Sequence, residues 1–347
     1  MKDYEKQHIK NIASYGRAVK KAYREAIDQV VNISYKLSLN ANDEFYFRNY
    51  PIVLKKVNKI LKELNTQVYG VTSEGINSEW DLAVEKNNNL AQLIYGKGLN
   101  QLPDDIKDLY LSNNDKARKA FLYRKYNGLG LSEKIWKNTT QLKTELELAL
   151  EVGIGKGQSA ANMTKTVKQY LNDPDKLFRR VRSKEDGILR LSKAAKSYNP
   201  GRGKYRSSYK NAHRLTANET NFSYEASQKE KRSQQDFIVG IEIKVSPRHK
   251  ASDDKGGISC LSLQGKYPKD FDFTNKWHVN CRCQSYNILK TDSELDKDLD
   301  LLLEDKQPTT NSENKVSTKP KNYTNYVKEN EKKWENWVNP PRFIVNN

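Results

Sequence analysis

Cysteine, histidine and methionine are scarce in this chain of 347 residues, which contains three, four and two of them respectively. Three cysteines are too few for a disulfide framework, so a network of disulfide bonds is excluded. No segment approaches the ~18–20 consecutive apolar residues of a transmembrane helix. The first residues also lack the apolar core of a secretory signal peptide. The sequence therefore predicts synthesis in cytosol-like conditions and no membrane partner.

Apolar side chains are also under-represented, because 36% of the residues are hydrophobic and 30% are charged, with a mean hydropathy of −0.91. Compact globular domains usually contain about 45–50% apolar residues. Part of the chain is therefore expected to be elongated, exposed or covered by a partner. The net charge of +18 favours polyanionic partners, since lysine and arginine displace counterions condensed on phosphates. A nucleic acid, an acidic protein and a merely basic soluble surface all fit this charge.

The N-terminal half of the chain has the pattern of amphipathic helices. Apolar residues recur at spacings of three and four over residues 9–31 and again over 53–64, with lysine and arginine opposite them. Further helices are predicted over residues 78–96, 115–128, 132–157 and 159–174. Ser132 and Ser159 are the expected N-caps of the last two, because a serine hydroxyl accepts a free backbone N–H at a helix start.

A strongly basic stretch runs from Lys176 to Arg214, with 13 lysine or arginine residues and 2 acidic ones. Pro200, Gly201 and Gly203 predict a loop within it. Tyrosines between the cations suit phosphate contacts with stacking support, so the stretch is a candidate DNA contact. A solvated face and a patch that meets an acidic protein are equally open. The candidate DNA-binding residues are Arg179, Arg180, Arg202, Lys204, Arg206, Lys210 and Arg214.

A β-strand is predicted over residues 237–245, where apolar and charged residues alternate. Short strands and turns are expected from there to about Leu289. Residues 290–322 are acidic at first and then rich in Ser, Thr, Asn, Lys and Pro, which predicts a linker with at most one short helix. Residues 323–347 contain several large apolar side chains, so this end is expected to dock on the body of the protein or on a partner.

The three cysteines cluster with one of the four histidines late in the chain. Four potential zinc ligands, of the types that tetrahedral sites use, fall within 24 residues: Cys260, His278, Cys281 and Cys283. His249 stands upstream as an alternative ligand. Two other interpretations stay open, namely cysteines packed as small apolar residues, or a disulfide from Cys260 to Cys281 or to Cys283.

Catalytic signatures are missing from the chain. It contains no H-E-x-x-H zinc-protease motif, no Walker loop and no G-x-S-x-G nucleophile elbow. The glycine-rich residues 153–157 are interpreted as a helix stop, because no strand precedes them as a phosphate-binding loop requires. A nucleophilic pair of Cys260 with His278 stays open. The chain is therefore expected not to be an enzyme and to have no small-molecule substrate.

Four short stretches follow one another in a distinctive order, namely RLTANETN, FIVGIEIKVSPRH, CLSLQGKYPKDFDF and WHVNCRC. Their order resembles that of the phage head morphogenesis family, the Mu F-like minor head proteins. That family has a C-terminal His-Pro-x-Cys-Arg-Cys signature, preceded by a cysteine and a Gly-Lys pair. The resemblance covers about residues 139–286, and the matching residues are Arg214, Glu219, Gly265, Lys266, His278, Cys281, Arg282 and Cys283.

The chain departs from the family pattern at two points. Val279 stands where the family has a proline, and Cys260 stands alone where many members have a Cys-x-x-Cys. A metal site of four cysteines is therefore impossible here. His278, or His249 in its place, would have to complete the ligand set.

The resemblance implies a minor component of the head of a tailed phage or prophage, made in the bacterial host cytoplasm and located in the virion. Such proteins are associated with the portal protein and the inner capsid shell, and they act in head assembly and in DNA packaging or ejection. Some contact double-stranded DNA. Zinc is the one cofactor expected. The alternative function is a zinc-dependent hydrolase or nuclease, or the delivery part of a phage-derived toxin.

The predicted fold class is α+β, with a mostly α-helical, elongated N-terminal part and a small α+β C-terminal Mu F-like domain. The expected divisions are a helical region over 1–131, the phage head morphogenesis domain over 132–289, a linker over 290–322 and a docking segment over 323–347. The helical region would dock on the portal or the inner shell.

Overall fold

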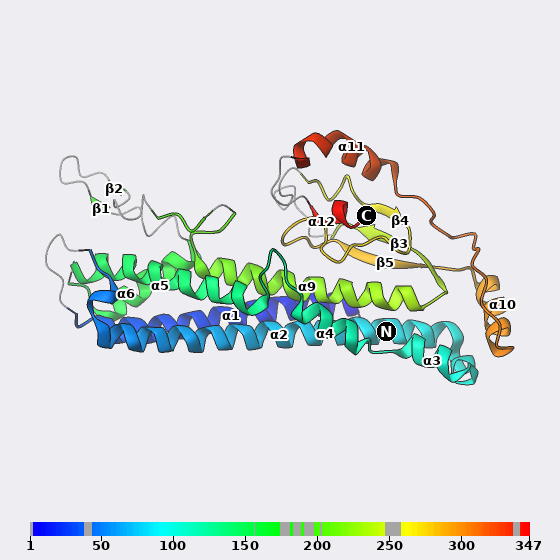
Figure 1. The fold of residues 1–347 in the computed structure, drawn as a ribbon, viewed down its shortest axis with the longest axis horizontal. Coiled ribbons are helices and arrows are strands. Elements are labelled where there is room, and N and C mark those ends of the chain that lie inside the picture. Colours follow the sequence, from blue (N-terminus) through cyan, green and yellow to red (C-terminus); the bar gives the residue numbers. More distant parts are fainter. Residues whose placement is uncertain are drawn as a thin grey trace. The chain divides into compact units, whose positions relative to one another are not determined.

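The computed structural model describes residues 3–37, 44–155, 157–173, 181–182, 189–190, 198–201, 203–246, 258–335 and 341–347. Of the described residues, 66% are helical, and they are accompanied by a small three-stranded antiparallel sheet, so the class is α+β (Figure 1). It divides into two compact units. The sheet unit comprises Met1–Ile12, Gly75–Leu122 and Asn218–Asn347, and the helical unit comprises Ala13–Glu74 and Tyr123–Ala217.

The main helices are α1 Tyr4–Ser34, α2 Pro51–Tyr95, α5 Leu131–Gly155, α6 Ala160–Asn172 and α9 Ser208–Gln234. The shorter helices are η1 Phe47–Asn49, η2 Gly96–Gln101, α3 Asp104–Leu111, α4 Asp115–Tyr123, α10 Asp292–Leu303, α11 Lys321–Glu335 and α12 Arg342–Val345. Two short strands, β1 Val181–Arg182 and β2 Leu189–Arg190, pair in antiparallel fashion. The helical pattern predicted for the N-terminal half is confirmed.

Helix α2 is a single helix of 45 residues, although the sequence patterns predicted separate helices over 53–64 and 78–96. No proline interrupts its interior. The buried side chains of Val68 and Ile76 extend the apolar stripe across the residues between the two predicted helices. Gly70 lies in this region but does not end the helix, because glycine costs only about 1 kcal/mol relative to alanine at an interior position.

The two predicted N-caps have different outcomes. The hydroxyl of Ser159 accepts the backbone N–H of Asn162 at 3.3 Å, so this residue caps α6 as predicted. Helix α5 begins at Leu131, so Ser132 lies inside the first turn and its prediction as a cap was wrong. A capping hydroxyl has to precede the first turn, where the backbone N–H groups are still free.

A buried carboxylate lies at the start of α9 in the helical unit. Glu145 on α5 accepts hydrogen bonds from the N–H and the hydroxyl of Ser208, at 2.8 and 2.6 Å. It also accepts from Tyr198 at 3.1 Å and from Gln141 at 2.8 Å. Burial raises the pKa of Glu145 to about 8, although these hydrogen bonds act in the opposite direction. Glu145 therefore joins α5 to the start of α9, and its burial makes the ionised form of its carboxyl group unfavourable.

Replacing Glu145 with glutamine is expected to flatten the dependence of stability on pH. Because the folded-state pKa of about 8 lies above the ordinary value of 4.5, this group stabilises the fold fully below pH 4.5 and loses that contribution as the pH rises through 8. The loss is on the order of 1.4 kcal/mol per pKa unit. Thermal melts across this pH range check it, with Glu133→Gln on the exposed side of α5 as the control. Equal pH profiles for wild type and Glu145→Gln would contradict it.

The sheet has the order β4-β3-β5, and its strands span Gly265–Tyr267, Ile238–Lys244 and Gln284–Leu289. Both pairings are antiparallel, with Ile241 opposite Tyr267 on one side and Asn287 on the other. The strand predicted over residues 237–245 is confirmed as β3, the central strand. Ile241 and Ile243 are fully buried, so the apolar side chains of the alternating pattern form part of the core of the sheet unit.

Residues 290–322, predicted as a linker, begin with helix α10. Thr291 and Glu294 form a capping box at its start, in which each side chain binds the backbone of the other residue. The ammonium group of Lys290 pairs with Asp298, and both groups are buried. The ion pair therefore holds α10 against Lys290, the residue that directly follows β5.

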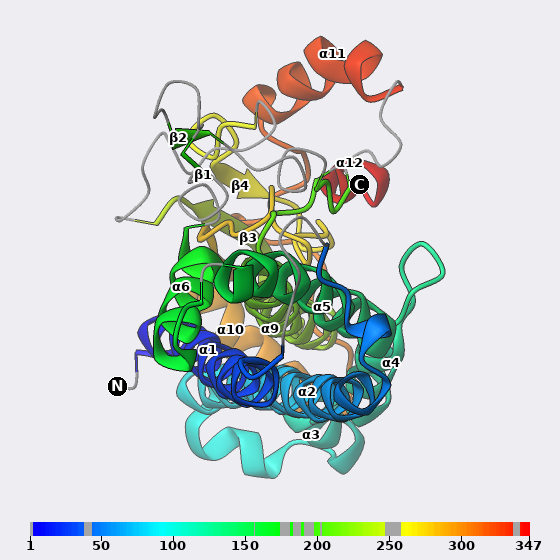
Figure 2. The same cartoon turned by 90° about the vertical axis from the view of Figure 1, so that its left-hand side faces the viewer.

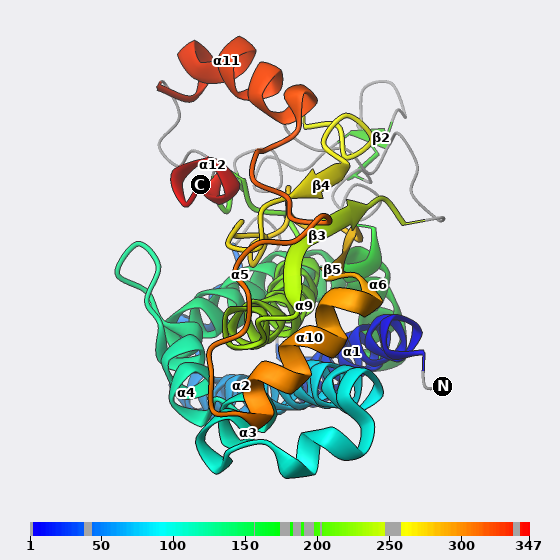
Figure 3. The same cartoon turned by 90° about the vertical axis from the view of Figure 1, so that its right-hand side faces the viewer.

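The chain between α10 and α11 crosses the sheet (Figure 3). The N–H of Val316 donates to the carbonyl of Val239 at 3.2 Å, beside the stretch of β3 that β4 does not pair. A Cβ atom on Gly240 would lie 2.7 Å from the side chain of Val316. A glycine is therefore needed at position 240 to make room for this crossing.

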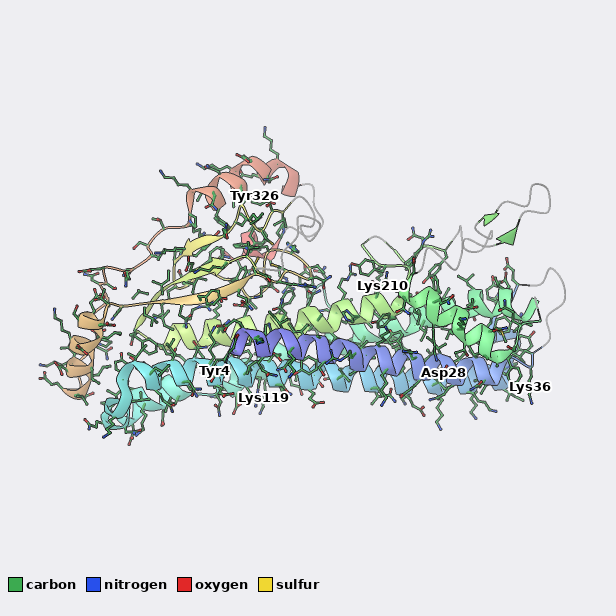
Figure 4. The ribbon with its side chains drawn as sticks, turned by 180° about the vertical axis from the view of Figure 1, so that it is seen from behind. Tyr4, Asp28, Lys36, Lys119, Lys210 and Tyr326 are labelled. Atoms are coloured by element: carbon green, nitrogen blue, oxygen red, sulfur yellow. The ribbon has the colours of Figure 1, made fainter. Side chains whose placement is uncertain are left out.

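Residues 323–347 contribute aromatic rings to the core of the sheet unit. Tyr323 and Phe343 are buried in it, and the rings of Phe343 and Trp277 lie 5.0 Å apart. The hydroxyl of Tyr323 donates to the carbonyl of Phe343 at 3.0 Å. Tyr326, labelled in Figure 4, packs against the same core. The core of the sheet unit therefore includes side chains from the end of the chain.

Candidate metal centre

Two tight turns in the sheet unit contain Cys260, His278 and Cys281. In the first turn, the N–H of Leu263 donates to the carbonyl of Cys260 at 3.3 Å. In the second, the N–H of Cys281 donates to the carbonyl of His278 at 3.1 Å, and Asn280 has a φ angle of 62°. Asparagine tolerates this left-handed conformation better than most side chains. The local sequence thus favours the sharp bend between His278 and Cys281.

Cys260, His278 and Cys281 form a compact group whose ligand atoms all lie within 4.8 Å of one another. The Sγ atom of Cys260 is 3.0 Å from Nε2 of His278 and 3.8 Å from Sγ of Cys281. The two cysteines are buried and the histidine is half-buried. This group could hold a metal ion. The structure brings together three of the four residues that the sequence placed in one ligand set.

Cys283 is the third buried thiol, and it interacts with the other two. Hydrogen bonding to Cys281 and Cys283, together with burial, raises the pKa of the Cys260 thiol far above its ordinary range. Burial would also raise the pKa of Cys281, but hydrogen bonds from the other two thiols and nearby positive charge lower it well below that range. The cluster therefore favours one thiolate, on Cys281.

The disulfide alternative is not realised in this structure. All three cysteines are free thiols. The 3.8 Å between the Sγ atoms of Cys260 and Cys281 is nearly twice the length of a disulfide bond, about 2.0 Å.

Cys260 and His278 are close enough for a thiol–imidazole pair, but they lack two properties of a catalytic one. Nucleophilic cysteines reach solvent and have a lowered pKa. Cys260 has 0% exposure, and its pKa is raised. The Nδ1 atom of His278 meets the carbonyl of Val279 at 2.9 Å, so this contact orients the ring without a carboxylate.

Helix α9 holds the second turn through two asparagine side chains. Asn221 donates to the carbonyl of Cys281 at 3.0 Å. Asn218 accepts the N–H of Asn280 at 2.9 Å, at the residue with the left-handed backbone. The bend between His278 and Cys281 is therefore held by hydrogen bonds to helix α9.

A buried ion pair links the same helix to Lys276, which lies two residues before that turn. The ammonium group of Lys276 is 2.6 Å from the carboxylate of Glu225, and both side chains are 1% exposed. Lys276 also donates to the carbonyl of Cys283 at 2.7 Å, and Ser285 donates to Glu225 at 2.7 Å. Burial would raise the pKa of Glu225, but the charges of Lys276 and Arg232 and its hydrogen bonds outweigh burial and lower it. Glu225 is therefore a charged, fully partnered group.

Helix α1 supports α9 at the same place. The Nε2 atom of His8 lies 3.0 Å from Oδ1 of Asn221, and its Nδ1 atom bonds the buried carboxylate of Glu79. The His8 ring stacks on Tyr224, with ring centroids 4.1 Å apart. A chain of polar contacts thus runs from Glu79 through His8 and Asn221 to the carbonyl of Cys281.

Sequence reasoning missed these supporting residues. The available signal was the spacing of Asn218, Asn221 and Glu225, which places three polar side chains on one face of α9. Buried carboxylates and amides look the same in a sequence as exposed ones, so their partners at His8 and Lys276 were not identifiable.

The candidate DNA-binding residues are only partly within the described structure. Three of them, Arg179, Arg180 and Arg202, fall outside the described residues, as does His249, the alternative zinc ligand. Lys204 is exposed, whereas Arg206 and Lys210 are half-buried. The guanidinium of Arg214 stacks on Tyr205 at 4.6 Å and donates to the carbonyl of Gly203 at 3.0 Å. Arg214 therefore holds the loop before α9.

Comparisons with protein-family models, with curated proteins and with solved structures found no match to this chain. Within the described ranges, no helix is both long enough and apolar enough to cross a bilayer. The features of this chain that point to a function are therefore its sequence motifs and the geometry of the cysteine–histidine cluster.

Proposed function

We propose that this chain is a minor head protein of a tailed phage or prophage, in which a zinc ion locks the sheet unit. It would associate with the portal protein and the inner capsid shell, act in head assembly and in DNA packaging or ejection, and contact double-stranded DNA. The proposal depends on one observation: among the residues that resemble the family signature, Cys260, His278 and Cys281 have their ligand atoms within 4.8 Å of one another, and all three cysteines, Cys283 included, are buried. That burial supports a structural role in the virion and argues against an enzyme.

The donor set and its spacing suit zinc. Tetrahedral zinc takes cysteine and histidine ligands, and Zn–S bonds of about 2.3 Å separate two sulfur atoms by about 3.8 Å. The Sγ atoms of Cys260 and Cys281 are 3.8 Å apart. The same geometry separates a sulfur from an imidazole nitrogen by about 3.6 Å. The 3.0 Å between Cys260 and His278 means that binding would need a small outward shift of the imidazole.

Cys283 decides between a structural and a catalytic site. With Cys283 as a ligand, three thiols and one imidazole fill all four positions, which is the arrangement of structural zinc sites. Bound zinc would then cross-link the two turns of a unit whose sheet has only three strands.

A zinc-dependent hydrolase or nuclease is the second candidate, and one observation favours it. Among the described residues, the group within 4.8 Å contains Cys260, His278 and Cys281 but not Cys283. If Cys283 stayed outside, zinc would keep the open position that catalysis requires. Cys283→Ser separates the two cases, because it weakens zinc binding in a closed site and leaves zinc bound in an open one.

The proposed function is tested on particles. DNA-filled heads from a bacterium that carries the gene are purified on a density gradient, and their proteins are identified by mass spectrometry. This chain is expected in the particles in few copies, together with the portal protein, and depleted from the soluble fraction. Intact heads that contain portal protein but lack this chain would overturn the proposal.

A further inference from the structure

A hollow of about 450 Å³ lies in the helical unit between α1, α6 and the start of α9. Figure 2 shows α1 and α6 side by side. The floor of the hollow is largely apolar and aromatic, with the side chains of Tyr23, Leu171 and Tyr209. Its rim is basic, with the side chains of Lys20, Arg24, Lys165 and Lys168. We call this feature the cationic hollow.

The charged residues that line the cationic hollow all have the same sign. The described residues that line it include four cations and no carboxylate. The whole chain has 43 acidic residues against 61 basic ones, so this lining is a local excess of positive charge. Such a concave basic site attracts anions, because its field is focused by the surrounding low-dielectric side chains.

Most of this charge is not neutralised by the residues that the structure describes. Lys168 pairs with Asp28 on α1, labelled in Figure 4, at 2.5 Å. Lys20, Arg24 and Lys165 have no ion-pair partner in the part of the chain that the structure describes. His213 on α9 responds to this field, since burial and then the charge of Lys20 lower its pKa. The hollow therefore offers about three positive charges to a ligand.

The cations form two short rows that face the same hollow. Lys20 and Arg24 are four residues apart on α1, and Lys165 and Lys168 are three apart on α6, so their Cβ atoms are about 5–6 Å apart within each row. This spacing is of the order of that between neighbouring phosphates on a nucleic-acid strand. Tyr209, half-buried in the floor, gives a sugar or a base an aromatic surface to contact.

We propose that the cationic hollow binds the phosphodiester backbone of nucleic acid, with neighbouring phosphates held between the cations of α1 and α6. This inference rests on the proposed function for its choice of DNA as the partner. It assigns the charge contacts to α1 and α6 and not to the basic stretch from Lys176 to Arg214.

An acidic protein surface is the competing ligand. The apolar and aromatic floor gives a carboxylate nothing to bind, whereas sugars and bases can pack on it. Phosphates are also contacted well by lysine and arginine without a fixed side-chain geometry. Nucleic acid is therefore favoured, and binding to an acidic polypeptide is an outcome of the test.

The test measures the salt dependence of DNA binding by the full-length protein. Fluorescence anisotropy is recorded with oligonucleotides of about 20 nucleotides, single-stranded and duplex. Removing three phosphate contacts is expected to weaken binding at low salt at least tenfold and to flatten the slope of log K against log salt by about 2–3. The variant combines Lys20→Gln, Arg24→Gln and Lys165→Gln.

A matched control removes the same charge elsewhere in the helical unit. It combines three substitutions of exposed lysines on α2, namely Lys55→Gln, Lys56→Gln and Lys62→Gln. Its slope is expected to change by less than half as much. A second variant, Lys20→Arg with Lys165→Arg, keeps the charge and should keep the wild-type slope, which separates lost contacts from a damaged fold.

Each outcome bears on the inference. A flattened slope with either oligonucleotide, in the hollow variant alone, supports it. Equal slopes for the hollow variant and the α2 control overturn it. Loss of binding to poly-glutamate with unchanged DNA binding also overturns it and identifies an acidic protein as the ligand. A flattened slope for a chain that is absent from particles would overturn the proposed function only.

Discussion

Cys281→Ser is expected to remove stoichiometric zinc from the protein and to unfold the sheet unit at temperatures where the wild type is folded. Cys281 is the thiol whose ionised form the cluster favours, and it lies 3.8 Å from the Sγ atom of Cys260. Structural zinc sites contribute about 10–16 kcal/mol of apparent binding free energy, which exceeds or equals the whole stability of a typical domain. Losing this ligand should therefore have a larger effect than the other substitutions proposed for this chain.

Zinc content by elemental analysis and thermal melts with and without a chelator measure this effect. A chelator should lower the melting temperature of the wild type and leave Cys281→Ser unchanged. Ser262→Ala, an exposed substitution in the turn that contains Cys260, is the matched control and should bind zinc normally. Zinc affinity should rise with pH, because thiols lose protons when they bind metal. A wild-type protein that melts identically with and without zinc would exclude the zinc lock.

Lys276→Met is expected to destabilise the sheet unit by about 3–5 kcal/mol, which is the usual cost of leaving one partner of a buried ion pair uncompensated. It leaves the carboxylate of Glu225 buried at 1% exposure without its main counter-charge. It also removes the hydrogen bond to the carbonyl of Cys283, so the segment that contains the cysteine ligands loses a contact that fixes its backbone.

The pH dependence of stability separates this mechanism from simple loss of packing. In the wild type, the pKa of Glu225 is lowered, so its contribution is present above the ordinary value of 4.5 and is lost as the pH falls. Without Lys276, its charge and its hydrogen bond no longer lower that pKa, so the pKa rises relative to the wild type. The variant should therefore lose less stability than the wild type as the pH falls. Melts at several pH values check this difference.

Two further variants serve as controls for the ion pair. Adding Glu225→Gln to Lys276→Met removes the unpaired charge, so it should restore part of the lost stability. Lys244→Met breaks the pair with Glu242 on β3, where the two side chains are 56% and 35% exposed. Such a pair contributes at most about 1 kcal/mol. Equal losses for Lys244→Met and Lys276→Met would contradict the prediction.

The elements with strong local patterns were predictable. The apolar stripes of α1 and α5, the alternation in β3 and the cap at Ser159 each depend on residues a few positions apart. The continuity of α2 was not predicted, because the stripe between its two halves is weak and its stability comes from buried contacts. The contacts made by residues 290–322 were also not predictable, since polar residues that hydrogen-bond to the backbone resemble those of a free linker.

The cysteine–histidine cluster was predictable in part. Its members share a short stretch and have ligand chemistry, so the sequence placed Cys260, His278, Cys281 and Cys283 together. The residues that hold the turn come from α1 and α9, and nothing in their local sequence distinguishes them from surface residues.

The sequence by itself determined the α+β class, the positions of most helices and of the central strand, and the identity of the candidate ligands. These properties depend on side-chain periodicity and on chemistry within a few residues. The tertiary structure alone decided that Glu225 faces Lys276, that His8 meets Asn221, and that cations of α1 and α6 line one hollow. Burial is the physical reason. A polar or charged group becomes energetically important only when folding removes it from water, and that depends on segments far apart in the chain.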